Sequence, residues 1–381
     1  MDHYAMKSFD VIVVGLGGMG SATAYHLAKR GAKTLGLERF QLNHVNGSSH
    51  GRTRIIRAIY YEHPSYMPLL KRAYPLWREL QGEYGKELLL QTGGLMIGPR
   101  EGKLVSNVID NAETHKLPYE LLSRNEVTKR YSVLRLPEDH VGVFDPNAGI
   151  LIPERCVEAH TTLAQRAGAE LHFNESMTDW MISGGKVFVK TEKDQYSTNS
   201  LIFTAGGWLP QLVSDIHLPL ESERQCMFWF QPVEQNELFS PERMPIFMWQ
   251  KGPDLFYYSF PDVGDGFKIA RHHHGEITSP DRIRGIDNRD EVSIRTFLKE
   301  NIPLANGRIL SSATCHYTNT PDQHFIMDFH PKHKNVILIS PCSGHGFKFS
   351  SVIGEIAAEL ALDGRTSLDT SFFRLTRIGV N

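Results

Sequence analysis

The sequence predicts an α/β plus β fold, in which a discontinuous nucleotide-binding domain is joined to a second, mostly antiparallel β domain. Three observations support this prediction. A glycine-rich turn near the N-terminus lies between a short apolar run and a helical segment. Aromatic, strand-like segments separated by Pro and Gly occupy residues 216–309. Near the C-terminus an apolar strand and an amphipathic helix return to the pattern of the first domain.

The glycine-rich turn is VVGLGGMG at residues 13–20, in which Gly15, Gly17 and Gly20 stand at G-x-G-x-x-G spacing. In a Rossmann-like unit the first glycine permits the tight turn and the second lets the backbone approach a pyrophosphate. The third lets helix and strand pack closely. Free N–H groups at the start of the helix attract the phosphates. A glycine turn without a ligand is the alternative, and the motif by itself does not separate NAD from FAD.

The elements around the turn have the order that dinucleotide binding requires. Val11–Val14 is an apolar, β-branched run that predicts a buried strand, and residues 21–29 predict a helix. Residues 33–37 predict the next strand, which leads into Glu38. This carboxylate follows the glycines by about 20 residues, where an acceptor for ribose hydroxyls is expected. The order of strand, turn, helix, strand and acid argues against an empty turn.

The rest of the chain completes both domains. Periodicity predicts helices at residues 64–84, 154–167 and 347–362, the last ending at Gly364, and strands at residues 186–191, 200–204, 227–230, 255–260 and 335–340. The predicted division assigns residues 8–90, 145–215 and 310–381 to the nucleotide-binding domain and residues 91–144 and 216–309 to a substrate domain.

Composition narrows the class of protein. The chain has 381 residues, 41% of them hydrophobic, and a formal net charge of -2. This supports two packed domains and gives no indication of nucleic acid or an anionic membrane as partner. No apolar run reaches the ~18 residues of a membrane span, and MDHYAMKSF lacks the core of a signal peptide. Four scattered cysteines argue against a disulfide framework, so a cytoplasmic protein is expected.

A basic segment follows the second nucleotide strand. It is NGSSHGRTRIIR at residues 46–57, and Arg54 and Arg57 would share a face if the segment formed a helical turn. A guanidinium is well suited to a bidentate grip on a carboxylate, so these arginines are candidates for orienting an acidic substrate. A solvated basic loop is the alternative.

Two histidine-rich segments invite a metal interpretation, but no metal site is predicted. His272, His273 and His274 are adjacent and do not point to one centre, and HFIMDFHPKH at residues 324–333 is predicted to be a polar loop at the edge of a core. Lys268 is predicted at the end of a buried strand. Burying its ammonium group costs free energy, so a functional role is expected for it.

Lys348 is a further candidate. It lies in CSGHGFKFSSVIGE, residues 342–355, at the predicted start of the last helix, where a cation opposes the helix dipole. Because a cation destabilises the start of a helix, Lys348 is expected to be there to bind a ligand.

Taken in order, the motifs resemble one known family. The glycine turn, NGSSHGRTRIIR, TAGGW (204–208), GFKIARH, CHYTNTPDQHFIMD (315–328) and SGHGFKFSSVIGE closely resemble those of monomeric sarcosine oxidase and N-methyltryptophan oxidase. These enzymes form the amine-oxidising branch of the D-amino acid oxidase-like flavoproteins. The resemblance extends from about residue 8 to residue 377.

The resemblance implies an FAD cofactor linked through its 8α-methyl carbon to Cys315, which composition alone would describe as a buried core thiol. It places Arg54 against the flavin ring, Arg57 and Lys348 on the substrate carboxylate, and Lys268 beside a water that promotes the reaction with oxygen. The implied lining of the substrate cavity is Tyr258, His272, Tyr317 and Met248. The implied cofactor contacts are Gly15, Gly17, Gly20, Glu38, Thr53, Cys315, Gly344, Gly346 and Phe347.

The implied activity is that of a monomeric FAD-dependent oxidase. It would convert an N-methyl or cyclic secondary α-amino acid, with oxygen, to an imine and hydrogen peroxide, and an N-methyl substrate would give formaldehyde and the primary amino acid. The sequence departs from the family at Arg52, where an aspartate is usual, and at Pro341-Cys342, which replace a glycine and a bulky apolar residue. Two alternatives remain: a flavin dehydrogenase of the same fold that passes electrons to a carrier, and a non-catalytic FAD-binding protein. A nicotinamide dehydrogenase would have no use for Cys315.

Overall fold

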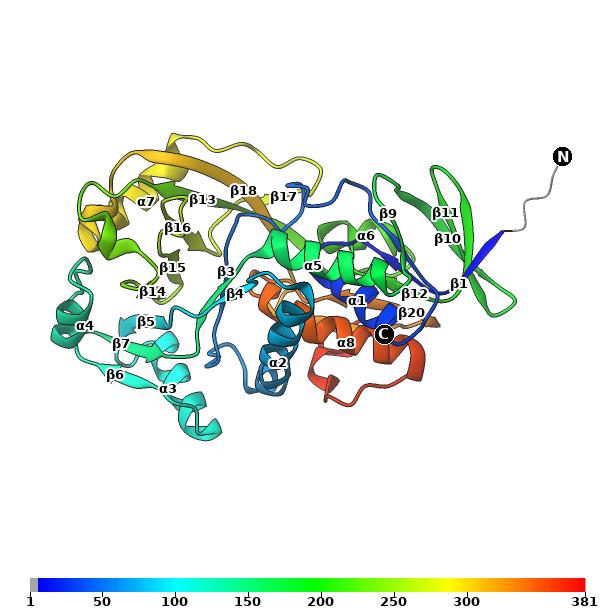
Figure 1. The fold of residues 1–381 in the computed structure, drawn as a ribbon, viewed down its shortest axis with the longest axis horizontal. Coiled ribbons are helices and arrows are strands. Elements are labelled where there is room, and N and C mark those ends of the chain that lie inside the picture. The colour runs from blue at the N-terminus through cyan, green and yellow to red at the C-terminus, as the bar shows by residue number, and fades with distance from the viewer. Residues whose placement is uncertain (1–5, 381) are drawn as a thin grey trace.

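The computed structural model describes residues 6–380 and places two large sheets toward opposite ends of an elongated molecule (Figure 1). Residues 1–5, on which part of the signal-peptide expectation rests, lie outside the described residues. None of the described helices has the length and apolar character needed to span a membrane.

The first sheet has eight strands and contains the glycine-rich turn. Its parallel part consists of β1 (Lys7–Val14), β2 (Thr34–Leu37), β9 (Glu170–His172), β12 (Gln195–Phe203) and β20 (His333–Ser340). Its antiparallel part consists of β10 (Met177–Ser183), β11 (Lys186–Thr191) and β19 (Ile326–His330). Strand β12 pairs with β1 along its length, with β11 over its first half and with β20 over its last residues. The last segment of the chain therefore completes the first domain.

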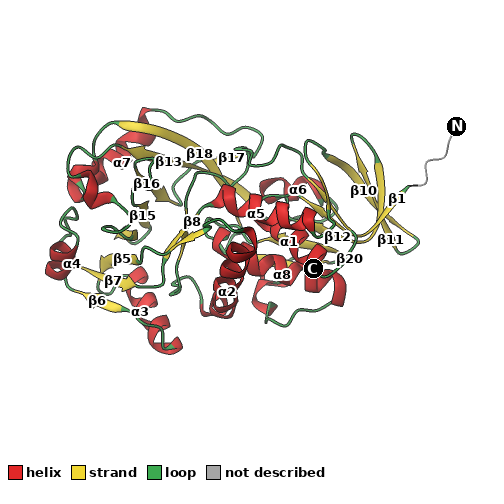
Figure 2. Ribbon diagram, in the orientation of Figure 1, coloured by secondary structure: helices red, strands yellow, loops and turns green. Residues whose placement is uncertain are grey.

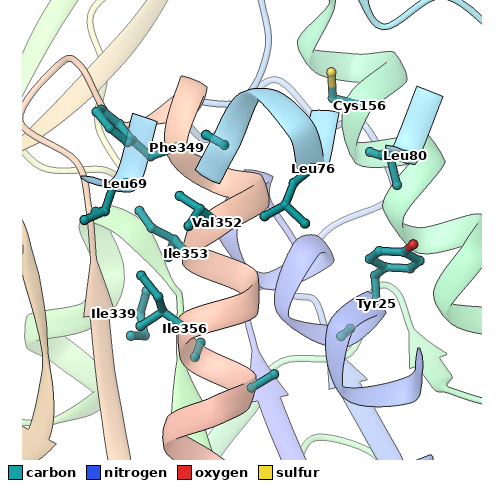
Figure 3. Close-up of a cluster of buried hydrophobic side chains, with 14 of the residues drawn as sticks. Tyr25, Leu69, Leu76, Leu80, Cys156, Ile339, Phe349, Val352, Ile353 and Ile356 are labelled. Atoms are coloured by element: carbon teal, nitrogen blue, oxygen red, sulfur yellow. The ribbon is translucent and has the colours of Figure 1, made fainter. Parts of the chain in front are cut away.

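Four helices pack beside this sheet: α1 (Gly18–Lys29), α2 (Met67–Tyr84), α5 (Pro153–Arg166) and α8 (Ser350–Asp363). Their apolar stripes form one core, in which Leu76, Val352 and Ile353 lie close together (Figure 3). Helices α1 and α8 approach closely because Gly354 has no side chain: a Cβ there would lie 2.6 Å from the Cβ of Ala22. The left-handed Gly364, at φ 68°, ends α8 as the sequence predicts.

The second sheet has nine strands. They are β5 (Gly94–Pro99), β6 (Glu120–Leu122), β7 (His140–Asp145), β13 (Glu221–Phe230), β14 (Ile246–Gly252), β15 (Leu255–Phe260), β16 (Phe267–His272), β17 (Ile277–Thr278) and β18 (Ile309–Asn319). Neighbouring strands run antiparallel, apart from the parallel pair β5 and β14. Aromatic side chains fill the core of this sheet, among them Phe247, Trp249 and Phe267.

Smaller elements complete the chain (Figure 2). Helices α3 (Lys103–His115), α4 (Arg124–Arg130) and α7 (Asn288–Asn301) belong to the second domain, and α6 (Leu209–Leu212) follows β12. A small sheet of β3 (Arg54–Ile56), β4 (Leu89–Leu90) and β8 (Gly149–Leu151) lies between the two large sheets. The proposed division of domains follows the two sheets except at residues 310–319, because β18 pairs with β13 in the second sheet.

The structure differs from the sequence interpretation at two places. Arg54 does not lie on a helical turn: Arg54–Ile56 form strand β3, whose residues pair with Gly149–Leu151 of β8. The β-branched Ile55 and Ile56 suit an extended backbone, and the pairing strand decides the conformation. Residues 326–330, within the stretch expected to be a polar loop, form strand β19, which pairs with β20.

Candidate active site

One cavity of about 440 Å³ joins the glycine-rich turn to the second sheet. Gly15, Gly17 and Glu38 line it at the nucleotide end, together with Thr204 to Trp208 and the loop before β3. A second set of lining residues, which we call the reacting end, consists of Arg54, Arg57, Glu62, Met248, Tyr258, His272, Cys315, Tyr317, His345 and Lys348. All four residues expected to line the substrate cavity belong to this set.

The glycines of the turn fit the three tasks expected of them. Gly15 adopts φ +94°, and a Cβ there would lie 2.9 Å from the carbonyl oxygen of Thr204. Gly17 immediately precedes α1 and lines the cavity, so the backbone stays open to a phosphate at the helix N-terminus. Gly20 does not line the cavity; a Cβ there would lie 1.7 Å from the carbonyl oxygen of Gly15, so this glycine permits helix and strand to pack.

Glu38 is buried and held in a fixed orientation. Its Oε2 accepts a hydrogen bond from the N–H of Leu16 at 2.7 Å, and its Oε1 accepts one from the N–H of Phe40 at 3.0 Å. Each carboxylate oxygen has a second lone pair, so acceptors remain for ribose hydroxyls. The cradle of glycines, the helix N-terminus and this carboxylate together fit a dinucleotide.

The segment before α8 closes the other side of the cavity. Gly344 adopts φ +77°, and a Cβ there would lie 2.5 Å from the ring of Tyr317. Gly346 lies against the carbonyl oxygen of Pro341, and Phe347 begins a short 3-10 turn. These glycines are therefore needed for close packing of the turn. Pro341 and Cys342 also line the cavity, so this departure from the family lies in the site itself.

Cys315 lies on β18 and is 2% exposed. Its thiol lines the same cavity as the glycine turn. Burial raises the pKa of the Cys315 thiol, and the positive charges of Arg54 and Lys268 oppose this shift. The position fits attachment of a cofactor in the cavity, and the two cations favour the thiolate that such a bond requires.

Arg54 and Arg57 both line the cavity, although they do not share a helical turn. Arg54 donates to the carbonyl oxygens of Ser48 at 2.8 Å and Thr53 at 2.9 Å. Arg57 is 1% exposed and pairs with the carboxylate of Glu62. Among the described residues, neither Arg57 Nε nor Glu62 Oε2 has a hydrogen-bond partner. The buried ion pair therefore keeps one free donor and one free acceptor.

Glu62 carries no predicted role, although it is an acid in the run YYE, directly after the basic segment RTRIIRAI, which is a signal for a partner of the arginines. Burial is the largest single influence and would raise the pKa of the Glu62 carboxyl. The charge and hydrogen bond of Arg57, with smaller contributions from His345 and Lys348, together outweigh burial, so the pKa lies below its usual value. Glu62 is thus an internal anion beside the cation that was expected to bind the substrate.

Lys348 is also buried and lines the reacting end. Its ammonium donates to the carbonyl oxygen of His345 at 2.6 Å. Burial, and next the positive charge of Arg57, lower the pKa of Lys348 to about 7, although Glu62 opposes the shift. An anionic ligand would favour the protonated form.

Lys268 was expected at the end of a buried strand, but it is the second residue of β16. There it pairs with Trp229 and Phe260 of the neighbouring strands. It is 1% exposed and does not line the cavity. Its ammonium donates to Gly51 O at 2.7 Å, Thr53 O at 3.0 Å and Thr53 Oγ1 at 3.1 Å, directly behind Arg54. Burial, followed by the charge of Arg54, lowers the pKa of Lys268 well below its usual value.

The remaining expected residues meet around one hydrogen bond. His272 Nδ1 and the Tyr317 hydroxyl are 3.1 Å apart. Tyr258 on β15 pairs with Met248 on β14 and with Ala270 on β16, so adjacent strands place these side chains together. Burial lowers the pKa of His272 well below its usual value, and an uncharged imidazole results.

Arg52, the departure from an acidic residue, is not among the residues that line the cavity. It adopts φ +67°, pairs with Asp265 at 3.3 Å, and places its guanidinium 4.8 Å from the ring centre of Trp229. The arginine is therefore used to attach the loop to the second domain.

Within residues 6–380, one group of side chains has the proximity of a metal site: Asp215, His330 and His333. His330 Nδ1 accepts a hydrogen bond from the N–H of Lys332 at 3.2 Å, so a neutral ring carries its proton on Nε2. That nitrogen lies 3.1 Å from the Asp215 carboxylate, to which it donates. His330 is thus engaged as a hydrogen-bonding residue and offers no lone pair to a metal.

Comparison with known proteins gives the family. A family described as FAD dependent oxidoreductase matches residues 10–360. Monomeric sarcosine oxidase from Streptomyces avermitilis is 41% identical, with 97% of this chain and 98% of that protein covered. N-methyl-L-tryptophan oxidase from Salmonella dublin is 32% identical, with 97% and 99% covered.

A solved structure shares the fold. NikD, described as an unusual amino acid oxidase essential for nikkomycin biosynthesis, matches with a TM-score of 0.84 and 24% identity over 97% of both chains. The cofactor of the matched family, FAD, agrees with the glycine cradle and the carboxylate of Glu38. This chain therefore belongs to the FAD-dependent oxidoreductases, in the group that contains monomeric sarcosine oxidase and N-methyl-L-tryptophan oxidase.

Proposed function

We propose that this chain is an FAD-dependent amine oxidase that acts on a secondary, N-methyl α-amino acid. The observation that carries the proposal is a pair of buried cations, Arg57 and Lys348, in the same cavity as the dinucleotide turn and Cys315. Two buried positive charges with one internal acid favour an anionic ligand. A carboxylate is the anion that an amino acid brings.

FAD, held by the glycine turn, Glu38 and Cys315, would supply the redox chemistry: a hydride equivalent from the carbon next to nitrogen and the N–H proton would leave the amine as an imine, and both would end on oxygen as hydrogen peroxide. Water hydrolyses the imine of an N-methyl amino acid to formaldehyde and the primary amino acid. Arg57 and Lys348 orient the carboxylate, and Arg57 Nε is a donor still free for it. The uncharged His272, beside Tyr317, does not repel the amine.

The relatives favour a small substrate. Identity is 41% to a sarcosine oxidase and 32% to an N-methyl-L-tryptophan oxidase. Sarcosine is therefore our first choice of substrate, N-methyltryptophan the second and a cyclic amino acid such as pipecolate the third. Pro341 and Cys342 depart from the family and line the cavity, so we expect this protein to differ from its relatives mainly in its preference among N-methyl amino acids.

A peroxide-coupled screen over sarcosine, other N-methyl amino acids and pipecolate tests the activity. We expect peroxide and formaldehyde in equal amounts from the best N-methyl substrate, with matching oxygen consumption. Reduction of a dye without oxygen uptake would identify a dehydrogenase instead. No turnover of any secondary amine by the yellow holoprotein would contradict the proposal.

We further propose that Cys315 holds the flavin covalently. Its support is the place of this thiol in the cavity, beside the charges of Arg54 and Lys268. Trichloroacetic acid should therefore precipitate the flavin together with the protein, and Cys315→Ala should release it. Cys156, which is buried in the core of the first domain, is the matched control, and Cys156→Ala should keep the flavin attached. Complete release of flavin from the unaltered protein would contradict the link.

A further inference from the structure

A hydrogen-bonded histidine, His345, lines the reacting end together with the cations Arg57 and Lys348. His345 Nε2 lies 2.9 Å from the carbonyl oxygen of Gln323, and His345 Nδ1 lies 2.6 Å from the Tyr60 hydroxyl. A carbonyl oxygen only accepts hydrogen bonds, so Nε2 carries the proton and Nδ1 is bare. The Tyr60 hydroxyl must therefore donate to Nδ1. The partners of the ring fix its tautomer and its orientation.

His345 remains uncharged. Burial lowers its pKa to about 3, and the nearby charges of Lys348 and Arg57 act in the same direction. Glu62 opposes them without reversing the shift. The bond from Tyr60 to a bare Nδ1 is thus retained throughout the neutral pH range.

The Tyr60 ring is a common contact of both cations. Tyr60 is 0% exposed; its ring centre lies 4.3 Å from the Arg57 guanidinium carbon and 5.3 Å from Lys348 Nζ. Tyr61 lies 4.7 Å from the same guanidinium. An aromatic face attracts a cation, and the attraction is larger in a desolvated site than at a surface. A small rotation of the Tyr60 ring would move the contact of both cations.

His345 also holds Lys348 through its main chain, since its carbonyl oxygen accepts the 2.6 Å hydrogen bond from Nζ. His345 therefore contacts Lys348 directly and is linked to Arg57 through the Tyr60 ring. The two cations repel each other, as the lowered pKa of Lys348 reflects. Their joint position depends on groups that hold each of them in place.

We propose that His345 is a positioning residue for substrate binding, which locks the Tyr60 ring and the Lys348 ammonium so that Arg57 and Lys348 meet a carboxylate as one prearranged unit. This inference rests on the proposed function, because it assumes that the two cations bind the carboxylate. The prearrangement increases the affinity for the carboxylate, because the side chains of Arg57 and Lys348 lose little conformational entropy on binding.

Two variants remove the hydrogen bond between Tyr60 and His345 while keeping most of the volume of each side chain. Tyr60→Phe removes only the hydroxyl, and His345→Leu removes the acceptor but keeps the carbonyl that holds Lys348. The probe is acetate, with acetamide as a neutral control of similar shape, and binding to the holoprotein is measured by the change in flavin absorbance. Loss of one hydrogen bond predicts about three- to tenfold weaker acetate binding in each variant. Acetamide binding should stay unchanged.

The double variant provides the sharper measurement. Because both substitutions break the same bond, the double variant should bind acetate no more weakly than the worse single variant. His345→Asn, which keeps an amide oxygen near the place of Nδ1, should recover part of the affinity. Tyr66→Phe is the matched control: this neighbouring buried tyrosine bonds to His324 at 3.2 Å instead, so acetate binding should not change.

Each outcome decides a different point. If Arg57→Met weakens acetate binding but Tyr60→Phe and His345→Leu do not, the positioning role is wrong and the carboxylate grip stands. If the losses add in the double variant, the two residues act separately and the inference also fails. If Arg57→Met leaves acetate binding unchanged, the grip is wrong and both the proposed function and this inference are overturned.

Discussion

The nucleotide end and the reacting end of the cavity are built in different ways. At the nucleotide end, glycines remove side chains so that the backbone can turn and pack, and Glu38 is held by two backbone N–H groups. At the reacting end, charged side chains line the cavity: Arg54 lies on β3, Arg57 and Glu62 follow that strand, and Lys348 lies in the segment before α8. Both ends combine segments that lie far apart in the chain: the glycine turn and Glu38 meet Thr204 to Trp208 at the nucleotide end, and the residues around β3 meet the segment before α8 at the reacting end.

This difference determines how each end responds to change. The nucleotide end has little room, so an added atom is costly there. The reacting end contains charges that burial disfavours, and the pKa of Lys348 is consequently lowered to about 7. We therefore expect substitutions at the nucleotide end to affect folding and cofactor retention, and substitutions at the reacting end to affect binding and rate.

The largest expected effect is at the nucleotide end. Gly20→Ala would place a methyl group 1.7 Å from the carbonyl oxygen of Gly15, so α1 must move away from β1. We expect a loss of about 3 kcal/mol or more in the free energy of unfolding, together with loss of FAD. Gly82→Ala in α2, where a Cβ meets nothing within 4 Å, should instead stabilise by about 0.5–1 kcal/mol. Thermal melts and flavin content measure both; equal melts for the two variants would contradict the close packing of α1 against β1 at Gly20.

The next effect concerns Lys268. Although Lys268 does not line the cavity, its ammonium is held close to Arg54 and would stabilise the negative charge that appears as oxygen is reduced, so Lys268→Met should slow reoxidation about 10²-fold or more. Anaerobic reduction by substrate should change much less. Stopped-flow traces of the two half-reactions provide the test, with Lys268→Arg expected to retain part of the rate. If Lys268→Met is reoxidised as fast as the unaltered protein, Lys268 has a structural role only, through its hydrogen bonds to Gly51 and Thr53.

A smaller effect is expected for Arg57→Met. Losing a charge-assisted hydrogen bond to the carboxylate costs roughly 1.5–3 kcal/mol, so the apparent substrate constant should rise more than about tenfold. Because the substitution also leaves the Glu62 carboxylate without its partner, the paired variant Arg57→Met/Glu62→Gln is the control. Steady-state kinetics with the substrate and with its amide measure the effect. The amide should be poor for the unaltered protein and gain nothing; a normal constant for the acid would exclude Arg57 from binding.

The smallest expected effect is a pH dependence of acetate binding. Lys348, with a pKa of about 7, is mostly protonated at pH 6 and mostly neutral at pH 8, so acetate should bind about tenfold more weakly at the higher pH. Arg57 stays charged, Glu62 stays ionised because its pKa is lowered, and His345, with a pKa of about 3, stays neutral. Titrations from pH 6 to 8 should give this slope, and Lys348→Met should flatten it. A slope that survives in Lys348→Met would assign the titration to another group.

The secondary structure of the nucleotide end could be predicted from the sequence. The strand, turn and helix around Gly15 and Gly20 were placed from spacing alone, and the expected end of the last helix at Gly364 is observed. At the reacting end the expected residues line the cavity, apart from Lys268 and the expected cofactor contact Thr53, which bond to each other away from it. Glu62, Tyr60 and His345 had no expected role, because pairing with Arg57 or with one another leaves no periodic pattern in the sequence.

The sequence by itself determined the elements whose geometry depends on near neighbours. A tight turn needs a residue that tolerates positive φ, and a helix needs its apolar stripe, so both can be read locally. Only the tertiary structure decided that Arg54 lies on a strand, that β18 joins the second sheet, and that Arg57 already has an acid beside it. The physical reason is that a buried charge takes its position and its pKa from partners that folding brings together from distant parts of the chain.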